Sequence, residues 1–255
     1  MNDNLAVLVK RGSDTARAGF SNEKDVIDKF NDWRSDIDAQ SWLYIMGYDL
    51  EKIEKIEATK VTGPHKADVQ VKIKVYMKDL IAAENISIKL VSNPTGFNQI
   101  DKRWINKYQQ LWAMPDDLVE ILKYFTGEHP PFKKGTKDSR RMLFLEMPTE
   151  MQKKVIDFFE KNKILVLTEI LKGTDNLAAN WMLIYLKSAN VWSLLPMSVV
   201  MSFYGEGSVR ITRSGGLIIG RIGMQRKGGD NGRPTAQMLQ FKINPALIVT
   251  ASNAV

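Results

Sequence analysis

The sequence of 255 residues contains no cysteine and only two histidines, His65 and His129. Without cysteine the chain can form neither disulfides nor a thiolate metal site, and two imidazoles disfavour a zinc site. Long apolar runs are also missing: none approaches the roughly 20 residues of a membrane span, and residues 1–14 lack the apolar core of a signal peptide. These absences predict a soluble, cytoplasmic protein.

The composition is that of a globular protein with an excess of positive charge. Hydrophobic residues make up 44% of the chain, which is enough for a substantial core, and the formal net charge is +7. Residues 205–255 hold seven basic and two acidic side chains, so 7 − 2 = +5 of that excess lies near the carboxyl end. This balance favours a polyanionic partner such as nucleic acid, although a membrane surface fits the charge as well.

Two alternating runs form the most informative local pattern. Residues 69–75 alternate between apolar and polar, which predicts a half-buried strand that starts at or just after Asp68. Residues 86–90 alternate in the same way, so Ser87 and Lys89 share one face of a second strand. If the two strands pair, a carboxylate, a hydroxyl and an ammonium meet in one cleft.

Such a cluster suits metal-assisted hydrolysis of a phosphodiester. A carboxylate holds a hard cation such as Mg²⁺, which polarises a phosphate. A lysine orients or deprotonates the attacking water and offsets the charge that develops in the transition state. The alternative for three polar residues on two strands is an ordinary solvated face of a sheet.

The pattern of Asp68 followed by Ser87-Ile88-Lys89 resembles the PD-(D/E)XK nuclease signature with its second acid replaced, at spacings of 87 − 68 = 19 and 89 − 68 = 21. The surrounding sequence is similar to the MspI-like branch of type II restriction endonucleases, above all to the HinP-type enzymes that cut GCGC. The segments that carry this resemblance are spread in order over most of the chain: SDTARAGFSNEKDVIDKFNDW, KLVSNPTGFNQIDKRW, FTGEHPPF, TKDSRRM and QRKGGDNGRPTAQMLQFKI.

The resemblance implies an α/β fold, a restriction-endonuclease-like mixed central sheet flanked by helices, with a C-terminal β-ribbon for DNA recognition. It implies one domain over residues 1–255, with a catalytic core at about 15–125 and a helical and recognition part at about 126–250. The implied cofactor is Mg²⁺ and the implied substrate is double-stranded DNA, cut at GCGC or at a related interrupted GC-GC palindrome. A cognate DNA methyltransferase is the expected functional partner, and the enzyme is expected to act as a monomer or a homodimer.

The resemblance also implies roles for single residues. Asp68 binds Mg²⁺, Ser87 occupies the second ligand position, where the branch usually has an amide, and Lys89 positions the water. Because a hydroxyl is a weaker ligand than an amide or a carboxylate, Ser87 acts through a water or the backbone carbonyl of Ile88 carries more of the coordination. Glu23, in a helix predicted to begin near residue 21, is a further candidate metal ligand; its alternative is an acid favoured by the helix dipole.

Two regions are predicted to contact DNA. The loop over residues 92–99 carries an aromatic at its tip, and the resemblance assigns Phe97 and Gln99 to the minor groove; the alternative is that Phe97 buries itself beneath the loop. Residues 217–225 and 238–243 predict a two-stranded ribbon that enters the major groove; the alternative is a solvated basic hairpin. The predicted DNA-binding residues are Phe97, Asn98, Gln99, Lys102, Gln225, Arg226, Lys227, Asn231, Arg233, Thr235, Gln240 and Lys242.

The rest of the chain supplies structure rather than chemistry. Helical periodicity predicts helices over residues 35–49 and 102–125, with a break at residue 115, and from a capping box at residues 149–152. Apolar runs predict strands over residues 164–168 and 181–186, and polar composition predicts connections over residues 50–60 and 77–85.

Two rival functions fit the same residues. One is a repair-type or nicking nuclease, which would prefer mismatched or damaged duplex to a defined sequence. The other is a DNA-binding protein without catalysis, since Ser87 replaces a usual metal ligand. Tight, salt-sensitive binding without Mg²⁺-dependent cleavage would identify the second.

Overall fold

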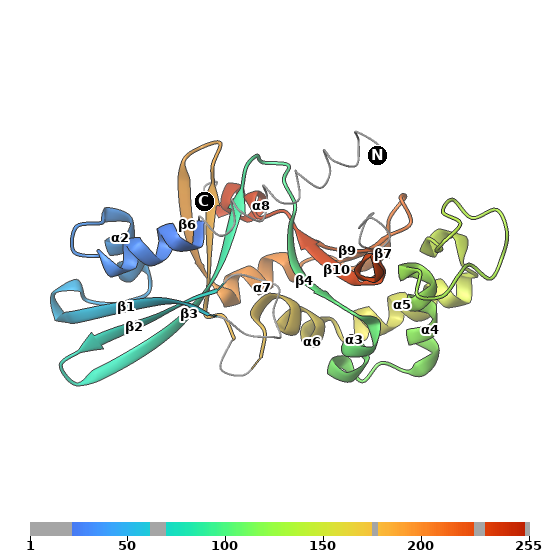
Figure 1. The fold of residues 1–255 in the computed structure, drawn as a ribbon, viewed down its shortest axis with the longest axis horizontal. Coiled ribbons are helices and arrows are strands. Elements are labelled where there is room, and N and C mark those ends of the chain that lie inside the picture. The colour runs from blue at the N-terminus through green and yellow to red at the C-terminus, as the bar shows by residue number, and fades with distance from the viewer. Residues whose placement is uncertain (1–21, 62–69, 175–177, 227–232, 253–255) are drawn as a thin grey trace. The chain divides into compact units, whose positions relative to one another are not determined.

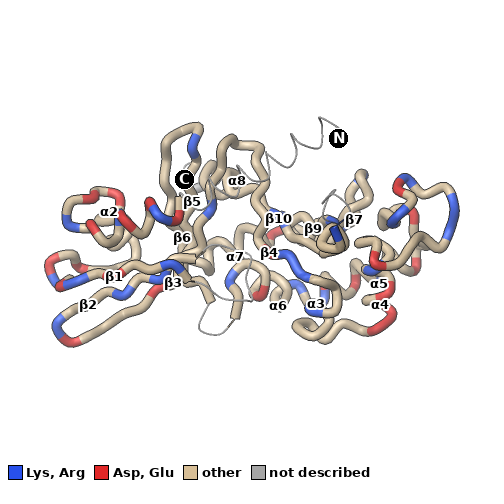
Figure 2. The backbone as a smooth tube through the Cα atoms, viewed as in Figure 1, with Lys and Arg blue, Asp and Glu red and all other residues tan. Residues whose placement is uncertain are grey.

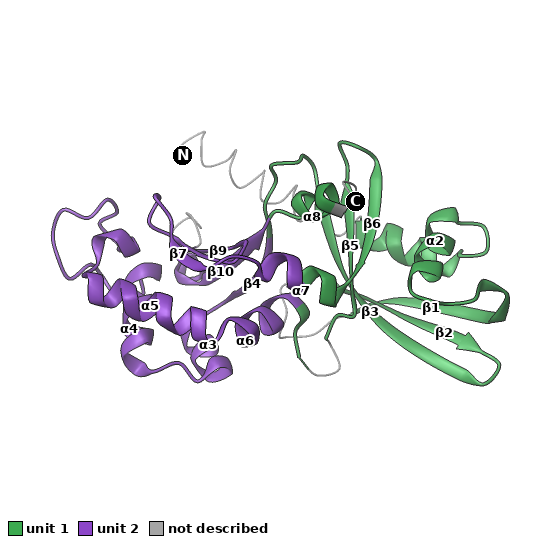
Figure 3. Ribbon diagram, turned by 180° about the vertical axis from the view of Figure 1, so that it is seen from behind, with its two compact units in different colours: residues 1–98, 172–200, 244–255 green, residues 99–171, 201–243 purple. Residues whose placement is uncertain are grey.

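The computed structural model describes residues 22–61, 70–174, 178–226 and 233–252. The chain divides into two compact units (Figure 3). Unit 1 consists of Met1–Asn98, Lys172–Val200 and Asn244–Val255, and unit 2 consists of Gln99–Leu171 and Met201–Ile243. Each unit is therefore assembled from segments that lie far apart in the sequence, and the single domain with a boundary near residue 125 stays a prediction.

Unit 1 is built on a mixed five-stranded sheet in the order β1-β2-β3-β5-β6 (Figure 1). Strands β3 and β5 pair in parallel, and the other neighbouring pairs are antiparallel. This sheet, with the helices around it, confirms the predicted mixed α/β architecture. The strands are β1 (Ile53–Val61), β2 (Gln70–Met77), β3 (Leu80–Val91), β5 (Trp181–Leu186) and β6 (Val191–Pro196).

The connections predicted over residues 50–60 and 77–85 are both wrong. Residues 53–61 form β1, whose buried Ile53, Ile56 and Ala58 face the core while charged side chains cover its outer face. Met77 pairs with Leu80, so only two residues separate β2 from β3. A two-residue turn closes a hairpin without any helical turn. Polar composition misled the prediction because a strand with one solvated face carries many charges.

Two helices cover one face of this sheet. Residues 22–31 are helical, and α2 (Ile37–Ile45) follows, with Asp36 as its N-cap accepting from the backbone N–H of Ala39. Lys29 ties the two helices together through ion pairs of 3.0 Å to Asp36 and 2.8 Å to Asp38. Their apolar side chains pack with those of the sheet in a single core made of Val26, Phe30, Trp33, Ala39, Trp42, Leu43, Ile53, Ile56, Ala58, Val71, Ile73, Val75, Ile86, Ile88, Leu183 and Leu194.

Unit 2 contains a second five-stranded sheet in the order β4-β10-β9-β8-β7. Strands β9 and β10 pair in antiparallel register, which confirms a ribbon near the carboxyl end and places it inside a larger sheet. The prediction of a single strand over residues 217–225 is wrong, because these residues form β8 and most of β9, which pair with each other around a turn at residues 220–221. The strands are β4 (Asn98–Arg103), β7 (Val209–Ile211), β8 (Leu217–Ile219), β9 (Ile222–Arg226) and β10 (Leu239–Ile243).

The remaining elements are mostly helical. The α-helices are α3 (Ile105–Trp112), α4 (Asp116–Thr126), α5 (Thr149–Lys161), α6 (Lys163–Leu167), α7 (Met197–Gly205) and α8 (Ala246–Ser252). Shorter helical turns are η1 (Leu50–Lys52), η2 (Phe144–Glu146), η3 (Thr168–Lys172) and η5 (Pro234–Gln237). Throughout the described ranges, no helix is long and apolar enough to span a membrane.

Aromatic side chains hold the helices of unit 2 against one face of its sheet. The rings of Tyr108 and Trp112 are stacked, with their centres 4.6 Å apart. Both rings make T-shaped contacts with Phe241 on β10, at distances between ring centres of 5.4 and 5.8 Å. Trp112 also contacts Phe159 on α5 at 6.0 Å. All four rings are buried, so they belong to the core of unit 2.

Three predictions for unit 2 need correction. Residues 164–168 lie in α6 and at the start of η3 instead of forming a strand, and Ile164 is exposed, because a short apolar run does not separate helix from strand. Lys102 and Arg103 end β4, so the helix predicted from residue 102 begins only at Ile105. Helix α5 does begin at Thr149, but Pro148 is its N-cap and makes no side-chain capping bond.

Candidate active site

Three polar side chains lie together on the face of the first sheet that points away from helix 22–31. Ser87 and Lys89 are two residues apart on β3, and Gln70 is the direct partner of Ser87 in the β2–β3 register. All three are buried, with exposed fractions of 2% for Gln70, 1% for Ser87 and 4% for Lys89. The predicted pairing of the two strands is confirmed. Asp68 lies outside the described residues, so its role as a metal ligand stays a prediction.

Two atoms of this cluster are buried without a hydrogen-bond partner among the described residues: Oγ of Ser87 and Nε2 of Gln70. Leaving a buried polar group unpaired costs about 1–3 kcal/mol. The two ends of an amide are assigned rather than observed, so Gln70 can present either its oxygen or its nitrogen at this point. Both atoms are therefore available to a ligand or to water.

A hard cation fits this donor set better than a transition metal does. No three His, Cys, Asp or Glu side chains within the described segments are placed to hold a metal ion. Hydroxyl, amide and backbone carbonyl oxygens suit Mg²⁺, which keeps several waters and needs few protein ligands. The side chain of Ile88 packs in the core, so only its backbone carbonyl is suited to coordination.

Glu23 lies beside a lysine of β1. Its side chain is 2% exposed, and Oε2 lies 2.6 Å from Nζ of Lys60, although neither oxygen makes a well-aligned hydrogen bond among the described residues. Lys60 pairs with Val71 on the core face, the face opposite to Ser87. The register therefore favours a structural ion pair for Glu23, and its role as a metal ligand stays a prediction.

The loop after β3 presents an aromatic side chain to solvent. Oδ1 of Asn93 accepts from the backbone N–H and the hydroxyl of Thr95, at 3.1 and 2.9 Å. Nδ2 of Asn244 donates to the backbone carbonyl of Pro94 at 2.7 Å and fixes the loop from outside. Phe97 is 61% exposed, so it is not buried beneath this braced loop. An exposed phenyl ring on a fixed loop is suited to contact a partner.

Several of the residues that follow Phe97 make contacts within the protein or are partly buried. Asn98 donates from Nδ2 to the carbonyl of Leu90 at 2.9 Å, and Gln99 and Lys102 are half-buried on β4. Arg103 pairs with buried Asp101 at 3.1 Å and lies 3.6 Å from Glu169. Figure 2 shows basic positions along β4 and toward α3. The guanidinium of Arg103 is thus held inside unit 2.

The β9–β10 register sorts the predicted ribbon residues onto two faces. Gln225 pairs with Gln240, and Gly223 pairs with Lys242, so the two glutamines and the lysine share one face. Gln240 is 5% exposed and donates from Nε2 to the carbonyl of Arg226 at 3.4 Å. Burial lowers the pKa of Lys242. This face carries the polar groups of the ribbon.

Arg226 lies on the opposite, core-facing side. It pairs with Leu239, and its guanidinium carbon is 6.0 Å from the centre of the Phe125 ring. Nη1 of Arg226 is buried and has no partner among the described residues. Burial and then the charge of Arg141 lower the pKa of Arg226. Within unit 2 this arginine is therefore separated from the polar face of the ribbon.

The ribbon tip is only partly described. Lys227 and Asn231 lie outside the described residues. Arg233 is exposed and is the N-cap of η5, and Thr235 is half-buried within that turn. The DNA-binding roles of these four residues stay predictions.

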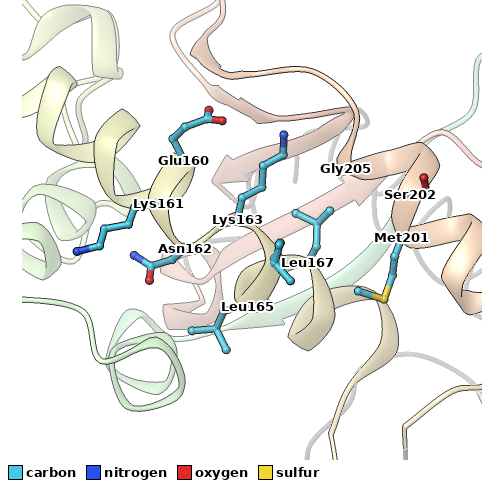
Figure 4. Close-up of a pocket in the computed structure, with 10 residues that line it drawn as sticks. Glu160, Lys161, Asn162, Lys163, Leu165, Leu167, Met201, Ser202 and Gly205 are labelled. Atoms are coloured by element: carbon cyan, nitrogen blue, oxygen red, sulfur yellow. The ribbon is translucent and has the colours of Figure 1, made fainter.

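Unit 2 also contains a pocket of about 640 Å³ between the α5–α6 corner and α7 (Figure 4). None of the predicted site residues lines it. Two of its charged residues already have backbone partners: Glu160 accepts from the N–H of Val209 at 2.6 Å, and Lys163 donates to the carbonyl of Gly207. The pocket therefore adds nothing to the candidate site.

The fold is that of a restriction endonuclease. The crystal structure of the restriction endonuclease MspI in complex with its cognate DNA matches with a TM-score of 0.60 and 13% sequence identity, over 92% of each chain. No curated protein matches the chain by sequence. The family described as R.HinP1I restriction endonuclease matches residues 46–249. The chain belongs to the R.HinP1I restriction endonuclease family, and it is a type II site-specific nuclease.

Proposed function

We propose that the chain cleaves double-stranded DNA in a Mg²⁺-dependent reaction at GCGC or at a related interrupted GC-GC palindrome. The observation that carries the proposal is the family match, which spans Asp68, Ser87 and Lys89. Buried Ser87 and Lys89 on one face of β3 support it, because such a face excludes water from a developing charge. MspI, which shares the fold, binds its cognate DNA in the matching crystal structure.

Asp68, Ser87 and the backbone carbonyl of Ile88 are the proposed metal-holding groups. Mg²⁺, when bound, would polarise the scissile phosphate. Lys89 positions the attacking water and offsets the negative charge that builds up on the phosphate. Ser87 contributes through its hydroxyl or through a water that it holds. Glu23 is left out of this set because its carboxylate pairs with Lys60.

Two groups of residues are proposed to contact the DNA. Phe97 and Gln99 work from the minor groove, where an apolar wedge unstacks a base step. Gln225, Gln240 and Lys242 read base edges in the major groove, where lysine pairs with guanine. The remaining proposed contacts to phosphates and base edges come from Asn98, Lys102, Lys227, Asn231, Arg233 and Thr235. Arg226 is set apart from the base-reading group because it packs over Phe125.

An enzyme that cuts a four-base palindrome would also cut the DNA of its own cell. A cognate DNA methyltransferase is therefore the proposed functional partner, and the cytoplasm is the proposed location. The enzyme acts as a monomer that nicks one strand at a time or as a homodimer that cuts both.

The test is incubation of the purified protein with a plasmid of known sequence, with Mg²⁺ or with EDTA, followed by sequencing of the ends. Discrete fragments that need Mg²⁺ and disappear in Asp68→Ala and Lys89→Ala are the expected result. An intact plasmid with tight, salt-sensitive binding would identify a DNA-binding protein without catalysis. Preferential cutting of mismatched duplex would identify a repair-type nuclease.

A further inference from the structure

Gln70 is the one residue of the buried cluster to which the signature gives no role. The side chain of Gln70 is 2% exposed. Gln70 is the first residue of β2, and the other polar side chains on the same face of β2 reach solvent. Lys72 is half-buried and Lys74 is exposed on that face. The burial of Gln70 is therefore a local feature of the end of the strand where Ser87 lies.

The pairing of Gln70 with Ser87 puts an amide beside the hydroxyl. Direct partners on antiparallel strands have Cβ atoms about 4.5–5.5 Å apart and point to the same side. Both side chains hold a buried atom without a partner among the described residues. A leucine at position 70 would avoid this desolvation cost, so the amide at this place needs a compensating interaction.

We propose that Gln70 coordinates the divalent cation of the active site through its side-chain amide oxygen, so that the second side-chain ligand comes from β2 and not from Ser87. An amide oxygen is a common ligand of hard cations. A serine hydroxyl beside it is free to hold a water of the same ion. This inference rests on the proposed function, since it needs the cation that Asp68 and Lys89 imply.

The test is a titration of the DNA-free protein with Mn²⁺, counted by electron paramagnetic resonance, in Gln70→Leu, Gln70→Glu and the matched control Lys74→Ala. Gln70→Leu is expected to weaken Mn²⁺ binding at least tenfold while its Tm in EDTA stays equal or rises. Gln70→Glu, which keeps an oxygen ligand, and Lys74→Ala are expected to bind at least as tightly as the unchanged protein. Wild-type affinity in Gln70→Leu overturns the inference.

A rescue experiment distinguishes ligation from packing. Adding Ser87→Asn to Gln70→Leu returns an amide oxygen to the cluster from the opposite strand, and it is expected to restore most of the lost Mn²⁺ affinity. A purely structural role for Gln70 predicts no recovery, because the second substitution replaces no lost packing.

Failure of the inference and failure of the proposed function give different results. Asp68→Ala is expected to abolish Mn²⁺ binding in the same titration. Loss in Asp68→Ala with full binding in Gln70→Leu overturns only the role of Gln70. Full binding in Asp68→Ala overturns the proposed active site, and with it the inference.

Discussion

Gln225 and Gln240 face each other across the β9–β10 ribbon, and Lys242 lies on the same face two residues further along β10. The two faces of the ribbon have opposite characters, because Phe241 and Met224 on the other side are completely buried. An antiparallel ribbon with one polar face is suited to the major groove. We therefore expect β9 and β10 to read base edges through residues of this face and not through those of the opposite face.

The first prediction is that Gln240→Ala relaxes sequence specificity. Removing one base-edge contact costs about 1–3 kcal/mol of discrimination, or roughly tenfold to a hundredfold in kcat/KM for the proper site relative to sites with one wrong base. Cleavage of a library of near-cognate duplexes measures it. Arg210→Ala, at an exposed residue of β7, is the control and should leave the ratio unchanged. Equal ratios in both variants would contradict a reading role for Gln240.

The second prediction concerns the charge of Lys242. Because burial lowers its pKa, the protonated form is destabilising in the folded protein, and this penalty disappears as the pH rises from the lowered pKa toward 10.5. Lys242→Met should therefore unfold at a higher temperature near neutral pH. The same variant should bind DNA more weakly, with specificity for guanine reduced.

Calorimetry and DNA titration test both halves of the Lys242 prediction. The difference in Tm between Lys242→Met and the unchanged protein should shrink as the pH approaches 10.5. A Tm difference that is constant between neutral and alkaline pH would show that packing, not charge, is responsible.

The third prediction is that Phe97→Ala impairs cleavage without affecting stability. The ring is 61% exposed, so truncation removes little buried area. Stacking of a base on an aromatic ring is worth about 1–3 kcal/mol, so kcat/KM should fall roughly tenfold to a hundredfold. Ile81, also 61% exposed, gives the matched control Ile81→Ala. Parallel measurements of DNA bending should show that only Phe97→Ala straightens the duplex.

The sequence predicted the strands around Ser87 and Lys89 because their alternation is local. It did not single out Gln70, because one alternating run also holds Lys72 and Lys74, and only the folded chain shows which of these polar residues is buried. The spacing of two residues between Asp68 and Gln70 was the signal that could have singled out Gln70, since residues two apart on a strand share a face. Burial at one end of a strand depends on contacts from distant segments.

The ribbon illustrates the same limit. Basic and amide residues near the carboxyl end predicted a DNA-binding hairpin, and the pairing of β9 with β10 is confirmed. Which of those residues share a face depends on the exact register, since a shift of one residue exchanges the faces. Sequence reasoning therefore grouped Arg226 with Gln240, whereas Arg226 packs over Phe125.

The fourth prediction separates the two roles considered for Glu23. In its ion pair with Lys60, the side chain of Glu23 is buried, with an exposed fraction of 2%, whereas that of Lys60 is 38% exposed. Glu23→Gln should therefore lower the free energy of unfolding by about 1 kcal/mol, because it removes the carboxylate charge from a partly exposed ion pair. Urea unfolding measures this loss. Mn²⁺ affinity should not change; a tenfold loss would instead support Glu23 as a metal ligand.

The fifth prediction is that Asp138 makes unit 2 sensitive to acid. Burial raises the pKa of its carboxyl, but Nε of Arg141 at 2.9 Å and the backbone N–H of Arg140 at 3.0 Å outweigh this effect and lower the pKa from 3.8 to about 2. A carboxyl with a depressed folded pKa contributes stability that is present above the unfolded pKa and lost as the pH falls through the folded pKa.

The window for this loss is therefore from about pH 4 down to about pH 2. Allowing for solvent screening, the contribution should be about 1 kcal/mol. Thermal unfolding of Asp138→Asn should show a smaller decline in Tm over this window than the unchanged protein, whereas Asp79→Asn, at the exposed β2–β3 turn, should follow the unchanged protein. The positive charges of Arg140 and Arg141 act on Arg226, and the negative charge of Asp138 opposes them. Protonation of Asp138 should therefore increase the electrostatic repulsion among the three guanidinium groups. Added salt should then restore part of the lost stability, because screening weakens their repulsion.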